Sequence, residues 1–193
     1  MKRRWKRTKG ANLNEKLSNE HHLKSSEAEC YFRNLEDHLV EFIRESESVV
    51  ICMAWLTNQK VLKELLEKPC VLILQNETWL NKKGGLAKKA RDMYQTLRER
   101  KDKVVLDKSV EKTRLITDIR VCGMISHPQN MHHKFVVRIQ GGIPTSVWTG
   151  SFNPTKNGNE SIENALIIHN EQIARAYFQE FLLVKAISKP LKI

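Results

Sequence analysis

Residues 131–140 read MHHKFVVRIQ, the pattern of a β-strand that opens with two histidines and a lysine. The rest of the run is mostly apolar and favours a strand in the protein interior. Histidine and lysine are costly to bury, because each needs a partner or must lose its charge. Successive side chains of a strand point to opposite faces, so His132 and Lys134 are expected to share one face. His133 is expected on the other face, together with Phe135.

The spacing of His132 and Lys134 suits a site for a phosphate group. A lysine can hold the anion, and a neutral imidazole beside it can act as a nucleophile or carry a proton. The pair alone also fits an ordinary exposed strand end, so the residues that follow have to decide between the two interpretations.

Two segments downstream supply further polar side chains. The run WTGSFNPT (148–155) ends a strand in a Gly-Ser turn and presents Ser151 and Asn153, which can donate hydrogen bonds to phosphate oxygens. The run NESIENALII (159–168) puts Glu163 at the start of the next strand. A carboxylate that bonds one ring nitrogen fixes a histidine tautomer and stabilises an imidazolium. The predicted site therefore combines a nucleophile, a cation, a neutral donor and an orienting acid: His132, Lys134, Asn153 and Glu163.

The order H-x-K, then G-S-x-N, then E-N-A-L-I-I resembles the phospholipase D superfamily with its HKD signature. The resemblance covers roughly residues 28–185. Residues 31–68 look like the opening helix–strand–helix unit of small single-motif members, and 173–181 look like their closing helix. The signature usually has an aspartate five positions after the lysine, where this chain has Ile139. In the family that aspartate is considered more structural than catalytic.

The resemblance implies a metal-independent phosphodiesterase that needs no cofactor, with two motifs in each active site. Single-motif members of the family pair as homodimers around a shared site. By analogy, His132 of one subunit attacks phosphorus to give a phosphohistidine, and His132 of the other protonates the leaving oxygen. Lys134 and Asn153 of both subunits would neutralise the transition-state charge, and Glu163 would orient His132. The sequence shows no clustered carboxylates and no Cys/His ligand set.

The chain is strongly basic, with 33 Lys and Arg residues against 22 Asp and Glu residues and a formal net charge of +11. Such an excess favours a polyanionic partner, nucleic acid first and an acidic membrane surface second. No apolar run follows the basic N-terminus, and no stretch of about 20 apolar residues occurs. We therefore expect a cytoplasmic protein without stable membrane insertion. Its widely spaced cysteines are expected to be free thiols: Cys30, Cys52, Cys70 and Cys122.

The length of 193 residues suits one domain. Residues 1–27 are polar and basic and are expected to form a flexible tail, with the phospholipase D-like domain at 28–193. The expected fold is α/β, a mixed β-sheet with helices on both faces. Hydrophobic periodicity predicts helices within 28–46, 57–68, 84–101 and 171–185. Short apolar runs predict strands within 48–55, 70–76, 103–110, 117–124, 134–139, 146–151 and 164–170.

Further residues are candidates for substrate binding. Thr57 follows the first predicted strand, and ligands of open α/β sheets favour the carboxyl ends of strands. The predicted helix at 84–101 has a basic face that either contacts substrate or is simply solvated, and its substrate candidates are Lys88, Lys89 and Arg91. Trp55 and Trp148 are expected in the core. Trp5 and Trp79 stand in polar contexts and are candidates for base stacking, and His127 lies in a predicted loop.

Three functions remain open at this stage. The first is a nuclease that cleaves DNA or RNA, which the basic charge favours. The second is the same chemistry on a phospholipid of the cardiolipin type, although no interface-seeking apolar element is visible. The third is an inactive nucleic-acid-binding protein with the same fold, which the Ile139 departure motivates.

Overall fold

The computed structural model describes residues 12, 14, 23–81, 88–110, 114–125 and 129–192. The helices within them are α1 (Leu35–Arg44), α2 (Gln59–Leu66), η2 (Thr78–Asn81), α3 (Lys88–Glu99), α4 (Lys156–Glu160) and α5 (Glu171–Ile187). The strands are β1 (Leu23–Lys24), β2 (Ala28–Tyr31), β3 (Ser48–Met53), β4 (Cys70–Gln75), β5 (Lys103–Val104), β6 (Leu115–Ile116), β7 (Asp118–Cys122), β8 (Lys134–Gln140), β9 (Ile143–Gly150), β10 (Ala165–Ile168) and β11 (Lys189–Pro190).

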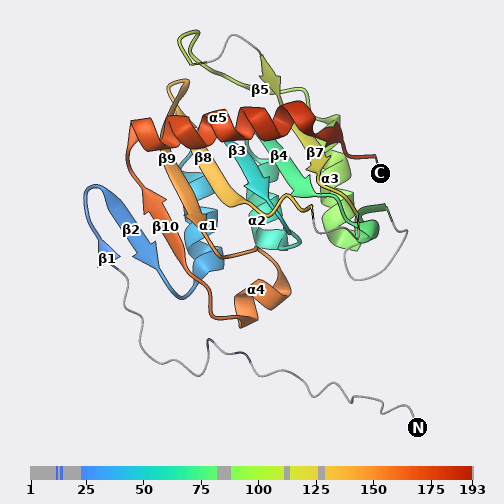
Figure 1. Ribbon diagram of the computed structural model, residues 1–193, viewed down its shortest axis with the longest axis horizontal. Helices are drawn as coiled ribbons and strands as arrows, with labels where there is room; N and C mark the ends of the chain where they lie inside the picture. Colours follow the sequence, from blue (N-terminus) through green and yellow to red (C-terminus); the bar gives the residue numbers. More distant parts are fainter. Residues whose placement is uncertain are drawn as a thin grey trace.

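One large mixed sheet organises the described part of the chain (Figure 1). Its strand order is β1-β2-β10-β9-β8-β3-β4-β7-β11, with β5 and β6 forming a separate two-stranded pair. The strands β3, β4 and β7 run parallel to one another, and β8 joins β3 in the antiparallel sense. The expected mixed sheet is thereby confirmed.

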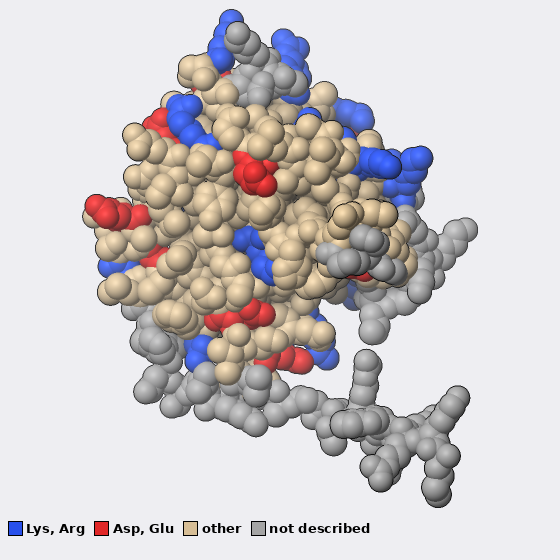
Figure 2. Space-filling model, in the orientation of Figure 1, with Lys and Arg blue, Asp and Glu red and all other residues tan. Residues whose placement is uncertain are grey.

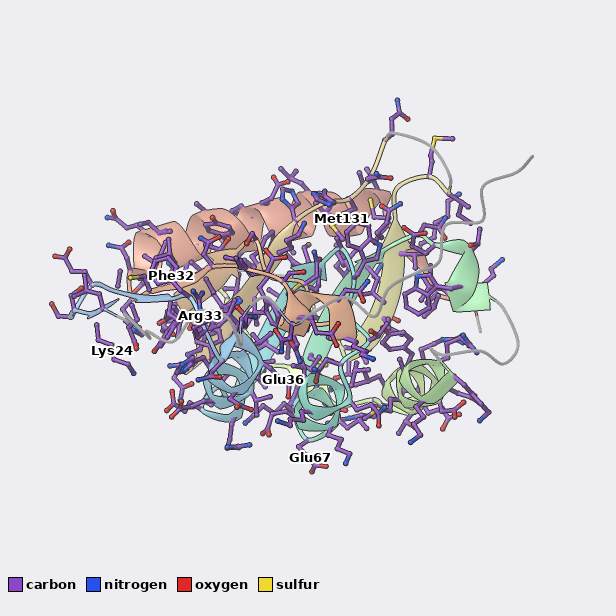
Figure 3. All side chains as sticks on the ribbon, turned by 90° about the horizontal axis from the view of Figure 1, so that it is seen from below. Lys24, Phe32, Arg33, Glu36, Glu67 and Met131 are labelled. Atoms are coloured by element: carbon purple, nitrogen blue, oxygen red, sulfur yellow. The ribbon has the colours of Figure 1, made fainter. Side chains whose placement is uncertain are left out.

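Helices cover both faces of this sheet, as the sequence predicted. Helix α5 crosses one face, and α1, α2 and α3 lie against the other (Figures 1 and 3). The alternation within β3 explains the two layers: Val49 and Ile51 belong to the apolar cluster with α1 and α2, whereas Val50 and Cys52 belong to the cluster with α5. Trp148 is fully buried in the first cluster, as expected for a core residue.

The N-terminal edge differs from the prediction of a helix beginning at residue 28. Residues 28–31 form β2, which pairs with β10, and α1 begins only at Leu35. Tyr31 matched the helical period because its side chain points into the core, where its ring stacks on Trp148 with centroids 6.2 Å apart. Asn34 separates strand from helix with a left-handed backbone, φ 53°.

Part of the segment assigned to the tail also contacts the folded domain. Leu23–Lys24 forms β1 against β2, and the Asn14 side chain donates hydrogen bonds to the carbonyls of Asn159 and Ser161 at 2.9 and 2.8 Å. The other tail residues before Leu23, including Trp5 but not Asn12, lie outside the described residues, as do His127 and the first four residues of the helix predicted at 84–101.

Two more elements depart from the sequence pattern. Of the strand predicted at 103–110, only Lys103–Val104 forms a strand, β5. Further along, the Asp107 side chain accepts the backbone N–H of Ser109 at 2.8 Å, a local bond typical of a turn. The polar loop predicted after residue 151 contains the short helix α4, where the Thr155 hydroxyl caps the N–H of Gly158 at 3.0 Å.

All four cysteines are free thiols, as expected. In the described part of the chain, none of the helices has the length and apolar character that crossing a membrane requires.

Candidate active site

The pairing of strands brings distant segments to one edge of the sheet. The N-terminal end of β8 lies beside the C-terminal end of β3, with Lys134 opposite Met53. The C-terminal end of β9 lies beside the N-terminal end of β10, with Gly150 opposite Ala165. Since β4 runs parallel to β3, its C-terminal end reaches the same edge, which faces the viewer in Figure 3. The segments expected to carry chemistry therefore meet here.

His132 and Lys134 lie side by side at this edge. The Lys134 Nζ is 3.1 Å from His132 Nδ1 and 3.4 Å from Nε2, and it donates to the His132 carbonyl at 2.8 Å. Burial, and then the positive charge of Lys134 and His133, lowers the pKa of His132 below its ordinary value of 6.5. The shift favours the neutral imidazole, which is the form that can act as a nucleophile.

His133 lies on the opposite face of the sheet, as strand alternation predicted. Its Nε2 is 3.0 Å from the Glu180 carboxylate on α5, and its ring lies 5.5 Å from that of Phe135. Adjacent histidines therefore have different surroundings, and His132 alone of the two joins Lys134.

Asn153 is fixed by the segment that leaves β3. Its Oδ1 accepts the backbone N–H of Trp55 at 3.3 Å, and the Pro154 carbonyl accepts the N–H of Thr57 at 2.9 Å. The Oδ1 is thereby engaged, so the Nδ2 donor is the group of this amide that can serve a substrate. Gly158 packs against the same loop: a Cβ there would lie 2.0 Å from the Asn153 carbonyl oxygen.

Ser151 and Glu163 form a pair in the structure. The Ser151 hydroxyl donates to the Glu163 carboxylate and accepts the N–H of Asn164 at 3.1 Å. Burial lowers the pKa of Lys134, and the negative charge of Glu163 opposes that shift. Glu163 thus lies beside the cation and is bonded by Ser151, whereas the sequence pattern predicted that Glu163 would bond the histidine and that Ser151 would face phosphate.

A cavity of about 400 Å³ adjoins these residues, within the range of small-ligand sites. Trp55 joins it to His132 and Lys134: the Trp55 ring is 5.3 Å from that of His132, edge to face, and lies 5.9 Å from Lys134 Nζ. The lining residues are Trp55, Thr57, Trp79, Asn153, Thr155, Lys156, Asn157, Gly158, Ser161 and Glu163. Thr57 therefore lines the site region, as expected, and Trp55 belongs to the site wall and not to the core.

Comparison with known proteins agrees with this geometry. Residues 39–184 match the family model described as cardiolipin synthase, PLD-like domain. The chain belongs to the phospholipase D-like family. It is 34% identical over 198 residues to the uncharacterized protein L381 of Acanthamoeba polyphaga mimivirus, covering 90% of this chain and 71% of that protein.

Solved structures of the phospholipase D-like fold are similar in architecture. Nuc from Salmonella typhimurium, a phospholipase D family member, superposes with a TM-score of 0.60 at 15% identity, over 86% of this chain and 98% of Nuc. NucT from Helicobacter pylori superposes with a TM-score of 0.59 at 12% identity, over 84% and 98% of the two chains. At these identities the likeness establishes the fold alone.

The basic helix of this phospholipase D-like chain stands apart from the cavity. Lys88 and Lys89 are exposed on α3, and Lys88 pairs with Asp92 at 2.8 Å. Arg91 donates to the Trp79 carbonyl at 3.0 Å and so supports a residue that lines the cavity. None of these three cations is among the residues that line the cavity. They could therefore contact only the portion of a substrate that extends out of the cavity.

The position of the usual HKD aspartate is apolar in this member of the family. Ile139 is fully buried in the cluster between the sheet and α5. It follows Lys134 by five residues along β8, which places it roughly 16 Å from the lysine. Arg138, beside it, pairs with Glu45 at 3.0 Å. The departure from the signature therefore lies in the packing of the domain, away from His132 and Lys134.

The polar groups of the site are an imidazole, an ammonium, an amide, hydroxyls and one carboxylate. Within the described residues, no group of three or more His, Cys, Asp and Glu side chains is arranged to hold a metal ion.

Proposed function

We propose that this protein is a metal-independent phosphodiesterase that hydrolyses nucleic acid through a phosphohistidine at a site shared by two copies of the chain. The observation that carries the proposal is the contact between the His132 ring and Lys134 Nζ, at 3.1 Å. A neutral imidazole with a lowered pKa is a competent nucleophile, and the ammonium beside it can hold the anion that it attacks.

The reaction then has two steps. A ring nitrogen of His132 attacks phosphorus, a P–N bond forms, and the P–O bond to the leaving group breaks while the leaving oxygen takes a proton from the second histidine. Water next attacks phosphorus and breaks the P–N bond, and the second histidine accepts the proton that the water loses. Lys134 and the Asn153 amide stabilise the charge on the phosphoryl oxygens. Glu163 balances the charge of Lys134 and is itself held by Ser151.

A second copy of the chain would supply the second histidine. His132 is the nucleophile of one copy, and the general acid has to come from the opposite side of the phosphorus. An apolar groove of about 600 Å³ borders His132 away from the first cavity and supports association there. Large apolar side chains are exposed in its walls: Met124 is 52% exposed and Ile187 is 73% exposed.

The distribution of charge supports a nucleic-acid substrate. Six of the 33 Lys and Arg residues lie within residues 2–9, where no acidic residue occurs. On the face shown in Figure 2, the lysines and arginines of the described residues are dispersed and most of the surface is uncharged. A strongly basic segment in the same chain as a cavity lined mostly by polar residues suits a long polyanion. A phospholipid substrate is the second candidate, because the matching family model is described as cardiolipin synthase.

The test uses labelled single-stranded DNA, duplex DNA, RNA and cardiolipin vesicles, each in excess EDTA. We expect nucleic-acid cleavage that His132→Ala lowers by about 10³-fold or more. His169→Ala is the control: it removes an imidazole that pairs with Glu29 at 2.7 Å and is not among the residues that line either cavity, and activity should persist. Loss of cleavage in EDTA, or full activity of His132→Ala, would overturn the mechanism.

Subunit mixing tests the shared site. Wild-type protein is dissociated and reassociated with an equal amount of His132→Ala protein. If every site needs both histidines, random pairing leaves about one quarter of the sites intact, against about one half for independent sites. A mixture with one half of the wild-type activity would contradict the shared site. So would a fully active protein that sediments as a monomer.

A further inference from the structure

Two tryptophans form walls of the cavity beside His132 and Lys134. Trp55 follows the end of β3 by two residues, and Trp79 lies in η2 beyond the end of β4. Because β3 and β4 are parallel neighbours, both chains leave the sheet at the same edge. Both side chains are half-buried, so each indole keeps part of its surface for a ligand.

The two indoles are held in place before any ligand arrives. Trp55 Nε1 donates to the Glu77 carboxylate at 3.1 Å, which leaves its ring surface as its means of contact. The Trp79 backbone is held by Arg91, and its ring lies tilted on that of Tyr94, with centroids 6.5 Å apart. Fixed aromatic surfaces bind with a small entropic cost of ordering.

Beside the Glu163 carboxylate, the remaining walls offer several neutral hydrogen-bonding groups. Thr57 comes from the segment after β3, and Asn157 and Ser161 come from α4 and its C-terminal end. Amide and hydroxyl groups of this kind can bond the edges of a base, while the aromatic rings bond its faces. Lys156 is the only cation among the described residues that line this cavity.

We infer that this cavity receives an unpaired nucleobase that adjoins the scissile phosphate, stacked on the indoles of Trp55 and Trp79, so that the substrate is single-stranded nucleic acid. The inference rests on the proposed phosphodiesterase function and specifies its substrate. The ring of Trp55 is 5.3 Å from that of His132, so a base on this wall belongs to a nucleotide next to the attacked phosphorus. Stacking accepts any base, so a broad sequence tolerance follows.

The same walls are poorly suited to a phospholipid. A glycerol headgroup has no aromatic face for the indoles, and a lipid enzyme needs an apolar surface that enters the interface. Beside the cavity, Ile162 is exposed, but the neighbouring lining residues Lys156, Asn157 and Ser161 are polar. One exposed aliphatic side chain at this cavity is ordinary for a protein surface, and the apolar groove with Met124 and Ile187 is assigned in the proposed function to the second copy of the chain.

The experiment compares two oligonucleotides of equal length and charge, one normal and one with abasic sites throughout a central block. We expect kcat/KM to be about tenfold or more higher for the normal strand, because the abasic block keeps its phosphates and has no stacking faces. Trp79→Ala should bring the ratio of the two values toward one, and Trp79→Phe should restore it. Thr78→Ala changes an exposed neighbour in the same turn and should leave the ratio unchanged.

The outcomes separate this inference from the proposed function. Equal cleavage of the normal and abasic strands, or equal cleavage of a single strand and its duplex, would overturn base stacking and leave the phosphodiesterase intact. Cleavage of cardiolipin vesicles with neither oligonucleotide cleaved would overturn the nucleic-acid substrate itself. Thermal unfolding of each variant shows whether it is folded. If Trp79→Ala is not folded, Trp79→Leu provides the readout, because leucine fills the partly buried position without an aromatic face and should likewise bring the ratio toward one.

Discussion

The side-chain oxygen of Asn153 accepts the backbone N–H of Trp55 at 3.3 Å, across 98 positions of sequence. This bond joins the turn after β9 to the segment after β3. It orients the Asn153 amide, which the proposed function assigns to the phosphate, and it fixes the backbone of Trp55, whose ring contacts that of His132. Asn153, Trp55 and His132 are therefore linked at one edge of the sheet, and under the proposed function changes at this edge should affect catalysis before they affect folding.

The pH dependence of cleavage should reflect the lowered pKa of His132. Burial and the charge of Lys134 disfavour the imidazolium, so the neutral nucleophile persists below pH 6.5 and the acid limb of kcat/KM should fall below that value. Lys134→Gln removes one of these causes and should raise the pKa, which moves the acid limb to higher pH along with a loss of rate. A pH series on both proteins measures this shift. An acid limb that stays in place in Lys134→Gln would show that the lysine does not act on the histidine.

Gly158→Ala should impair catalysis by displacing Asn153. The added methyl group would lie 2.0 Å from the Asn153 carbonyl oxygen, so the loop must move. We expect kcat to fall about 10- to 100-fold, since a small misplacement at a reacting centre is costly. Gly141→Ala is the control: its φ of +56° makes the substitution strained, but nothing lies within 4 Å, so stability should fall while kcat persists. If kcat is the same in both variants, Gly158 does not help to position Asn153.

Restoring the aspartate of the family signature should harm this protein. Ile139→Asp places a carboxylate in a fully buried apolar cluster, and we expect a loss of about 3 kcal/mol or more in the free energy of unfolding. Ile139→Val removes one methylene group and should cost about 1 kcal/mol. Urea unfolding of both variants measures the difference. A stable and more active Ile139→Asp variant would show instead that the aspartate has a place in the site.

The N-terminal hairpin should loosen in acid. Burial acts to raise the pKa of Glu29, but hydrogen bonds from Lys24, Tyr31 and His169 outweigh it and lower the pKa from 4.5 to about 2. The folded state therefore favours the ionised carboxylate, and its contribution is complete above pH 4.5 and disappears as the pH falls toward 2. Glu29→Gln should be less stable at neutral pH, and the difference should vanish in acid. A difference that is constant from pH 7 to pH 2 would contradict the lowered pKa.

Binding of nucleic acid should depend on the basic N-terminal residues. Exchange of the six Lys and Arg residues within 2–9 for Gln should weaken binding of single-stranded nucleic acid and make the plot of log K against log salt shallower, by about 0.7 for each phosphate that the variant no longer neutralises. Exchange of the exposed Lys63 and Lys101 for Gln is the control for charge removed elsewhere. An unchanged slope in the first variant would place the binding surface entirely on the folded domain.

Local patterns predicted most of the elements and failed where tertiary contacts outweighed them. Alternation in 131–140 separated His132 from His133, because a strand has only two faces. Tyr31 was assigned to a helix because a core-facing strand residue can match a helical period by chance. Trp55 was assigned to the core because an aromatic residue next to an apolar strand is usually buried, and the sequence carries no sign that this strand ends at a cavity.

By itself, the sequence determined the type of sheet, the two helical layers and the pairing of His132 with Lys134, because these depend on the period of apolar residues and on short spacings. Only the tertiary structure decided that Glu163 is bonded by Ser151, that Ile139 is packed away from the site, and that Trp55 and Trp79 share a cavity. Those relationships depend on which strands are neighbours and in what register. Register is set by the burial of the whole sheet, so no single segment carries it.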